Sequence, residues 1–296
     1  MSSPKRKKKS FKRKKTRINQ KKSVNQEINL EHKDNSDRKT VLELKNSKLI
    51  EIKTKKTMIS GINIAVSEGD VVLITGMNGI GKSTLFKALL GFIGNDEEKY
   101  AKIDDEKTFL FCGYAEKKNL NRQIINIMQS NFLGFPLRRA KTSLLEAVPD
   151  KFADKEEYLA KWLKKYNPLT DEDKKKNLLE KFIFQLSGGE EKYLSILEGL
   201  VRCEDSEVKL ALIDEPTNNL DTRHMRQLSD LILRIRHYNP HLAFIMISHC
   251  RLWPYITKAY EIRQKHIGEI AYTPHTCLGE PDDDGYYQKE MKPKQM

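Results

Sequence analysis

A glycine-rich segment, residues 76–84, carries residue types that bind phosphate groups. It reads Gly-Met-Asn-Gly-Ile-Gly-Lys-Ser-Thr and fits the pattern G-x-x-x-x-G-K-S/T. Glycines allow backbone N–H groups to wrap around an anion at the start of a helix, where the helix dipole favours negative charge. Lys82 is expected to reach the β- and γ-phosphates of a nucleotide, and the hydroxyl of Ser83 to ligate Mg²⁺. The residues expected to bind the nucleotide here are Gly76, Asn78, Gly79, Ile80, Gly81, Lys82, Ser83 and Thr84.

Two adjacent carboxylates follow a second apolar run. Leu-Ala-Leu-Ile at 210–213 is followed by Asp214 and Glu215. Successive side chains on a strand point to opposite sides, so the two acids can do different work. Asp214 is expected to hold the shell of the Mg²⁺ ion, and Glu215 to face an attacking water as its base or polariser. An apolar strand ending in Asp-Glu is common by itself, but beside a phosphate-binding loop it is informative.

Alternating strands and helices are expected to position these residues. The apolar run 71–75 predicts a strand buried on both faces, directly before the glycine-rich segment, and a helix is expected to begin near Lys82. Residues 118–185 are charged and show helical spacing. The pattern predicts an α/β fold of the P-loop NTPase type, with a mostly parallel central sheet, an N-terminal antiparallel β part and an inserted α-helical subdomain. The other expected elements are strands at 41–45, 59–66, 210–213 and 242–248, a helix at 225–238, and a closing hairpin at 259–270 around Gly268.

Charge and composition divide the chain. Residues 1–25 hold 12 Lys or Arg and no acid, whereas the whole chain of 296 residues has 54 bases and 41 acids. We expect a disordered basic tail at 1–40, a nucleotide-binding domain at 41–275 with its helical subdomain at about 118–192, and a flexible tail at 276–296. The basic tail could contact a polyanion such as nucleic acid, a ribosome or an acidic surface, or it could be a solvated extension without a target.

Cysteine spacing and hydropathy indicate the cellular setting. The cysteines Cys112, Cys203, Cys250 and Cys277 are far apart, which is not the pattern of a disulfide framework. Neither a secretory signal nor an apolar run near 20 residues is found in the sequence. A cytoplasmic protein is therefore expected, reaching a membrane, if it does, as a peripheral subunit held by another polypeptide.

Further motifs resemble those of the ATP-binding cassette (ABC) ATPase family. Residues 186–190, Leu-Ser-Gly-Gly-Glu, resemble the family's signature motif, with Glu190 where Gln is usual. Residues 216–221 resemble its D-loop, and residues 247–249, Ile-Ser-His, resemble the strand end that carries its switch histidine. With the phosphate loop and the acidic strand end, these motifs follow the family's order over residues 41–270. The chain resembles a single nucleotide-binding domain of this family.

The resemblance implies a mechanism shared between two domains. In the family, two cassettes sandwich two ATP molecules head to tail, and the signature of one caps the γ-phosphate bound by the other. Asp221 is then expected to link the two sites, and His249 to contact the γ-phosphate. The implied catalytic residues are Glu215, His249 and Lys82. The residues implied at the signature side are Ser187, Gly188, Gly189 and Glu190.

Several positions depart from the family pattern. The Q-loop glutamine, which in the family helps to ligate Mg²⁺ and contacts the partner, is expected after a strand ending near residues 113–114, and Glu116 stands there instead. Residues 47–56 lack the aromatic residue that stacks on adenine, so only an apolar contact from Ile50 or Ile52 is expected. After the signature, two positions that are usually basic hold Tyr193 and Glu198.

Three functions are compatible with these motifs. The first is the energising subunit of a membrane transporter, which hydrolyses Mg-ATP as a homo- or heterodimer and couples it to conformational change in an integral-membrane subunit. The alternative is a soluble F-type-like ABC ATPase acting on ribosomes or nucleic acid, favoured by the Glu-ended signature, by residues 214–221 and by the basic tail. A non-hydrolysing, ATP-switched scaffold ranks last, because Glu215 and His249 are both present.

Overall fold

The computed structural model of the chain describes residues 38–93, 101–104, 109–111, 120–128, 135–168, 177–249 and 253–273. The C-terminal tail expected at 276–296 and nearly all of the basic tail expected at 1–40 lie outside these ranges. Glu116 and three of the cysteines, Cys112, Cys250 and Cys277, also lie outside them, while Cys203 is buried.

The described elements alternate between strands and helices along the chain. The strands are β1 (Thr40–Glu51), β2 (Thr57–Ser67), β3 (Val71–Gly76), β4 (Ala101–Asp104), β5 (Phe109–Phe111), β6 (Ile124–Ile127), β7 (Leu210–Asp214), β8 (Ala243–Ile247), β9 (Lys258–Arg263) and β10 (His266–Ile270). The helices are α2 (Lys82–Ile93), α3 (Leu120–Gln123), α4 (Ala140–Ala147), α5 (Lys155–Tyr166), α7 (Gly188–Leu200) and α8 (Thr222–Tyr238), with 3-10 turns η3 (Ile183–Gln185) and η4 (Val201–Glu204). None of the described helices is both long enough and apolar enough to span a bilayer.

The described strands form one sheet with a parallel and an antiparallel part. Their order is β4-β1-β2-β10-β9-β3-β8-β7-β6, and β5 also pairs with β1. The strands β9, β3, β8, β7 and β6 run parallel to their neighbours in that series. By contrast, β1 pairs antiparallel with β2, β4 and β5. The expected α/β fold, with a mostly parallel central sheet and an N-terminal antiparallel part, is confirmed.

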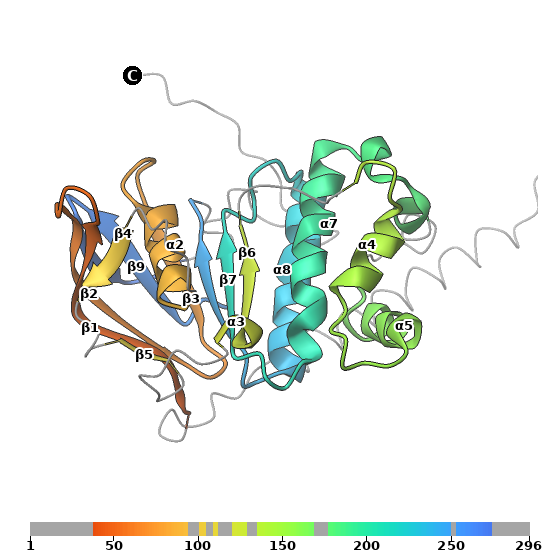
Figure 1. The fold of residues 1–296 in the computed structure, drawn as a ribbon, viewed down its shortest axis with the longest axis horizontal. Helices are drawn as coiled ribbons and strands as arrows, with labels where there is room; N and C mark the ends of the chain where they lie inside the picture. Colours follow the sequence, from red (N-terminus) through yellow and green to blue (C-terminus); the bar gives the residue numbers. More distant parts are fainter. Residues whose placement is uncertain are drawn as a thin grey trace, which may run out of the picture. The chain divides into compact units, whose positions relative to one another are not determined.

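The central strands are buried on both faces, because successive side chains enter different cores. On β3, Val71 and Leu73 belong to one core cluster, and Val72 and Ile74 to the other. The first cluster lies under α4, α5, α7 and α8, and the second lies between the sheet, α2 and the antiparallel strands. Figure 1 shows α2 and the antiparallel strands on one side of β3 and the pair α7 and α8 on the other.

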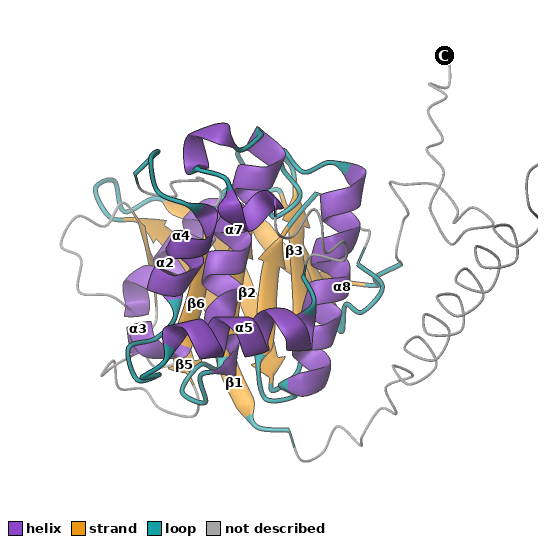
Figure 2. Ribbon diagram, turned by 90° about the vertical axis from the view of Figure 1, so that its right-hand side faces the viewer, coloured by secondary structure: helices purple, strands orange, loops and turns teal. Residues whose placement is uncertain are grey.

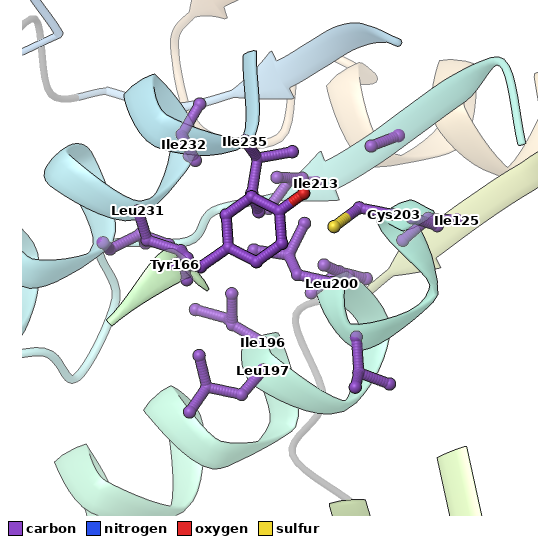
Figure 3. Packing of buried hydrophobic residues seen from close by; sticks show 14 of the residues in the cluster. Ile125, Tyr166, Ile196, Leu197, Leu200, Cys203, Ile213, Leu231, Ile232 and Ile235 are labelled. Atoms are coloured by element: carbon purple, nitrogen blue, oxygen red, sulfur yellow. The ribbon is translucent and has the colours of Figure 1, made fainter. Parts of the chain in front are cut away.

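An apolar stripe on α5 fixes the helical part against this sheet. Leu159, Trp162, Leu163 and Tyr166 are buried, as their helical spacing predicts. Figure 2 shows α5 crossing in front of the sheet. In Figure 3 the ring of Tyr166 lies among labelled side chains of α7 and α8. The expectation that this stripe packs against neighbouring elements is confirmed.

Two local expectations were wrong. The stretch 118–185 was expected to be helical, but Ile124–Ile127 form the edge strand β6, parallel to β7. Three β-branched isoleucines, with only Asn126 exposed, suit a strand that is buried beside β7. The closing hairpin turns at Gln264 and Lys265, which have φ angles of 47° and 65° as a type I′ turn requires. Gly268, the expected turn, lies within β10 opposite Glu261.

Candidate nucleotide-binding site

The glycine-rich segment lies between β3 and α2, as its proposed role requires. Buried β3 ends at Gly76 and α2 begins at Lys82. Gly76 has a φ angle of 148°, and a Cβ atom there would lie 2.8 Å from the carbonyl oxygen of Ile262 in β9. Only glycine fits this approach. The first N–H groups of α2 have no intrahelical partner, so they are available to bind an anion.

The side chain of Lys82 is folded over this loop. Its Nζ donates to the carbonyl oxygens of Gly76 at 2.9 Å and Met77 at 3.1 Å, and lies 3.1 Å from Nε2 of His249. Only 6% of Lys82 is exposed. Burial lowers the pKa of the Lys82 ammonium, while the carboxylates of Glu215 and Asp214 act in the opposite direction. The ammonium is thus held where the loop, the acidic strand end and His249 meet.

Asp214, the last residue of β7, lies beside Ser83 at the start of α2. The Ser83 hydroxyl hydrogen-bonds to the Asp214 carboxylate, which is almost fully buried. Burial raises the pKa of Asp214, and this outweighs the hydrogen bond and the nearby lysines. Its Oδ1 has no hydrogen-bond partner among the described residues. A hydroxyl and a carboxylate oxygen with free acceptor capacity fit Mg²⁺, which prefers oxygen ligands.

Glu215 has an unusual backbone conformation directly after β7. Its φ angle is 45°, in the left-handed region that costs a non-glycine residue about 1–3 kcal/mol. Its N–H donates to the carbonyl oxygen of Ile247 at 2.9 Å, which ties it to the end of β8. Oε1 lies 3.2 Å from Nε2 of His249, while Oε2 is buried without a hydrogen-bond partner in the described part of the chain. Burial raises the pKa of Glu215, as suits a proton acceptor.

The signature segment is organised as a helix N-terminus. Ser187 is the N-cap of α7, and its Oγ accepts from the N–H of Glu190 at 3.3 Å. Oε2 of Glu190 accepts in return from the N–H of Ser187 at 3.0 Å, which completes a capping box. A Cβ atom on Gly189 would lie 3.1 Å from the carbonyl oxygen of Asn219, so α7 begins against the D-loop.

Asp221 has a local structural role in the described chain. Its Oδ1 accepts from the N–H of His224 at 2.8 Å, and it is the N-cap of α8. Before it, Thr217 lies with its hydroxyl 3.4 Å from that of Ser248, at the end of β8. The D-loop is thereby fixed between the acidic strand end and α8.

The structure thus brings together one part of the predicted site. At the ends of β3, β7 and β8, His249 lies within hydrogen-bonding distance of both Lys82 and Glu215, and Ser83 hydrogen-bonds to Asp214, on which the charge of Lys82 also acts. The side-chain hydrogen bonds of Ser187 and Glu190 within the described residues run between these two residues and to Lys181, and none of them reaches the phosphate loop.

The Q-loop residue expected at Glu116 lies outside the described residues, and that expectation stays a prediction. The last strand described before this position is β5 (Phe109–Phe111), which pairs antiparallel with β1. Strand β6 lies beside β7 in the parallel part of the sheet, and its register pairs Ile127 with Ile213. The sequence continues with Met128 and Gln129, and Gln129 lies outside the described residues.

Sequence reasoning also passed over Lys192 in α7. It is 1% exposed, and its Nζ donates to the carbonyl oxygen of Met128 at 3.3 Å. Burial lowers the pKa of Lys192, and Asp214 and Glu215 oppose that shift. Lys192 therefore joins the signature helix to the residue after β6.

The two unusual residues after the signature have packing roles. The hydroxyl of Tyr193, which is buried, donates to the carbonyl oxygen of Pro168 at 2.6 Å. The carboxylate of Glu198 accepts from the hydroxyl of Ser143 in α4. Both therefore hold α7 to the helical part of the chain.

Comparison with known families agrees with this geometry. A family model described as ABC transporter matches residues 59–218, more than half of the chain. The chain therefore belongs to the ABC transporter family, and it is an ATP-binding, ATP-hydrolysing cassette of that family.

Two relatives are similar to this chain over most of their own length. The lipoprotein-releasing system ATP-binding protein LolD of Cytophaga hutchinsonii is 27% identical over 202 residues, 65% of this chain and 83% of that protein. The ergothioneine transport ATP-binding protein EgtV of Helicobacter pylori is 29% identical over 198 residues, 66% and 84% respectively. The structure of cbiO1 from Clostridium perfringens, part of the ABC transporter complex cbiONQ, has a TM-score of 0.58 at 20% identity and covers 78% of this chain and 87% of that one. At that identity it shows the fold alone.

Proposed function

We propose that this cassette is the energising subunit of a membrane transporter. It binds Mg-ATP in a head-to-tail pair of cassettes and transmits the resulting movement to a separate integral-membrane subunit. The cluster of Lys82, Ser83, Asp214, Glu215 and His249 carries the catalytic part of this proposal. The transport relatives LolD and EgtV support the coupling role.

The residues of the cluster divide the work on ATP. The loop N–H groups and Lys82 bind the β- and γ-phosphates, since an ammonium and a helix N-terminus both favour anions. Ser83 and Asp214 hold Mg²⁺, which when bound neutralises phosphate charge. Glu215, with its raised pKa, orients the attacking water and accepts its proton. His249 donates a hydrogen bond from Nε2 to an oxygen of the γ-phosphate.

A second cassette supplies the remaining anion-binding groups. Ser187, Gly188 and Gly189 begin a helix whose first N–H groups can cap a phosphate. Their contacts in the described chain do not reach its own phosphate loop, which supports a role across a dimer. Asp221 ends the D-loop, against which the signature helix α7 begins, and it links the two ATP sites.

We assign the Q-loop role to Gln129. The support is that Gln129 comes two residues after β6, which runs parallel to β7, and that the family's Q-loop glutamine is expected after a strand. The bond from Lys192 to the carbonyl oxygen of Met128 then connects the Q-loop to the signature helix. A displacement of Met128 would therefore be transmitted to the signature helix α7 through Lys192.

An exposed apolar patch suits a membrane partner. Phe135, Leu137 and Phe184 are exposed by 72%, 77% and 59%. The N–H of Phe184 donates to the carbonyl oxygen of Pro136 at 3.1 Å, so the two segments lie side by side. Phe184 lies two residues before the signature, which begins at Leu186. The exposed aromatic side chains of the patch suit the apolar face of a helix from the membrane subunit.

The proposal is tested by fractionating tagged Glu215→Gln protein from its native cells in the presence of ATP. Recovery in the membrane fraction with an integral-membrane protein is expected. Recovery with ribosomes or RNA, lost when residues 1–25 are deleted, would contradict the transporter role and support the alternative.

A further inference from the structure

A charged signature creates an electrostatic problem for the anion that it is proposed to cap. Glu190 lies in the first turn of α7, next to Glu191. A helix N-terminus acts as about half a positive charge. A full negative charge in the same turn outweighs that half charge, so an uncompensated Glu190 would repel the γ-phosphate.

Lys181 lies against this carboxylate. Its Nζ donates to Oε1 of Glu190 at 2.9 Å and to Oε2 at 3.0 Å. Both side chains are only partly exposed, 29% for Lys181 and 23% for Glu190, so water screens the pair less than it would screen a surface pair. Lys181 comes from the segment just before η3, and the 3-10 turn places it beside α7.

The same carboxylate is also held by the capping box. Oε2 accepts from the N–H of Ser187 at 3.0 Å. Burial raises the pKa of Glu190, but the hydrogen bonds from Lys181 and Ser187 together outweigh burial and lower the pKa below its usual range. Glu190 is therefore ionised at neutral pH, and Lys181 supplies the compensating charge.

We infer that Lys181 is a positioning residue of the nucleotide site: it neutralises Glu190 so that the start of α7 can accept the γ-phosphate of ATP bound by a second copy of this chain. This inference rests on the proposed head-to-tail dimer. A glutamine at position 190 would keep the capping box, because its amide oxygen can accept from Ser187, and would need no lysine.

The test is ATP-dependent dimerisation of the full chain, measured by light scattering over a range of ATP concentrations in the Glu215→Gln background. Lys181→Met is expected to raise the half-saturating ATP concentration roughly threefold to tenfold. Lys181→Met combined with Glu190→Gln is expected to return it to the parent value, and Glu190→Gln alone, which leaves the charge of Lys181 uncompensated beside the start of α7, is expected to lower it. Lys181→Arg keeps the charge and is expected to behave like the parent.

The variant that combines Lys181→Met with Glu190→Gln distinguishes charge compensation by Lys181 from a purely structural link between η3 and α7. If Lys181 served only to hold η3 against α7, Lys181→Met would be impaired equally with Glu190 or Gln at position 190, and the inference would be overturned. Equal half-saturating ATP concentrations for the parent and Lys181→Met would also overturn it. The matched control is Lys161→Met, which removes a lysine from an exposed i,i+4 pair with Glu157 on α5 and is expected to change nothing.

Two further observations distinguish this inference from the proposed function. Failure of the Glu215→Gln parent to dimerise with ATP would contradict the head-to-tail dimer itself, and the inference with it. A parent that dimerises, with a Lys181→Met defect that shrinks as salt rises, would support charge compensation, because salt screens the unpaired carboxylate.

Discussion

Nζ of Lys82 lies 3.1 Å from Nε2 of His249, although the two residues are far apart in the chain. The same Nε2 lies 3.2 Å from Oε1 of Glu215. One imidazole nitrogen cannot accept from an ammonium and donate to a carboxylate at the same time. His249 therefore pairs with Lys82 when Nε2 is unprotonated and with Glu215 when it carries a proton. Only the second form can donate to a γ-phosphate.

His249→Ala is expected to lower ATP turnover by about a hundredfold while changing ATP affinity by less than about threefold, because the lost donor acts mainly on the γ-phosphate during reaction. His249→Gln retains an N–H donor and is expected to keep part of the activity. Steady-state kinetics with separate kcat and KM values check this. A large change in KM with normal kcat would contradict the assigned role.

Lys82→Ala is expected to weaken ATP binding by at least about a hundredfold, because it removes the charge-assisted bonds to two phosphates. Isothermal titration of the purified cassette measures this directly. The control is Lys161→Ala on α5, which removes an exposed lysine paired with Glu157. Normal ATP affinity in Lys82→Ala, with an unchanged melting temperature, would contradict the phosphate-loop assignment.

Turnover is expected to fall with decreasing pH earlier than an ordinary glutamate would predict. Burial raises the pKa of Glu215 above its usual value of 4.5, and its carboxylate must be ionised to accept a proton. Activity is therefore lost as pH falls through this raised pKa. A kcat–pH profile at saturating ATP checks the position of the acid limb, and a limb at or below 4.5 would contradict it.

Glu215→Gln is expected to stabilise the cassette at neutral pH in the absence of nucleotide. A carboxyl whose folded pKa is raised contributes stability below its unfolded pKa and loses that contribution as pH rises through the folded pKa. Removing the charge recovers it, and each kcal/mol gained raises Tm by about 2–4 °C. The gain should shrink at low pH, and thermal unfolding at several pH values measures it. A lower Tm for Glu215→Gln at neutral pH would contradict the burial cost.

The exposed patch gives a prediction about the partner alone. Phe184→Asp is expected to reduce recovery of the membrane subunit by about tenfold or more, because a charge replaces an apolar anchor. ATP binding by the isolated cassette should remain unchanged. Tyr238→Asp, at a half-exposed aromatic residue at the end of α8, is the matched control. Co-purification measures the loss, and normal recovery with Phe184→Asp would exclude this surface.

Much of the fold could be predicted because its central strands are clear in the hydrophobic pattern of the sequence. Strands β3, β7 and β8 are unbroken apolar runs, and the motifs that follow them mark the edge of the sheet at which the site lies. Strand β6 could not be distinguished from the surrounding helical pattern, because its four residues are too few to show the alternation of a strand. Because β6 was missed, Glu116 was the only residue considered for the Q-loop role.

Contacts between distant segments were beyond sequence reasoning. The strained φ angle of Glu215 and the position of His249 between Lys82 and Glu215 depend on three strands ending at one edge. The pairing of Lys181 with Glu190 depends on a 3-10 turn that brings two charges together. The sequence shows which residue types are present and how they are spaced, whereas the packing of the fold determines which side chains contact one another.

The sharing of each ATP between two cassettes is tested most directly by mixing two inactive variants in the Glu215→Gln background. Lys82→Ala destroys the phosphate loop and Ser187→Arg blocks the signature, so neither alone should retain ATP after gel filtration. A mixed head-to-tail dimer holds one intact site, and the 1:1 mixture is predicted to elute as a dimer with bound ATP. A mixture that retains no more ATP than either variant alone would contradict the account.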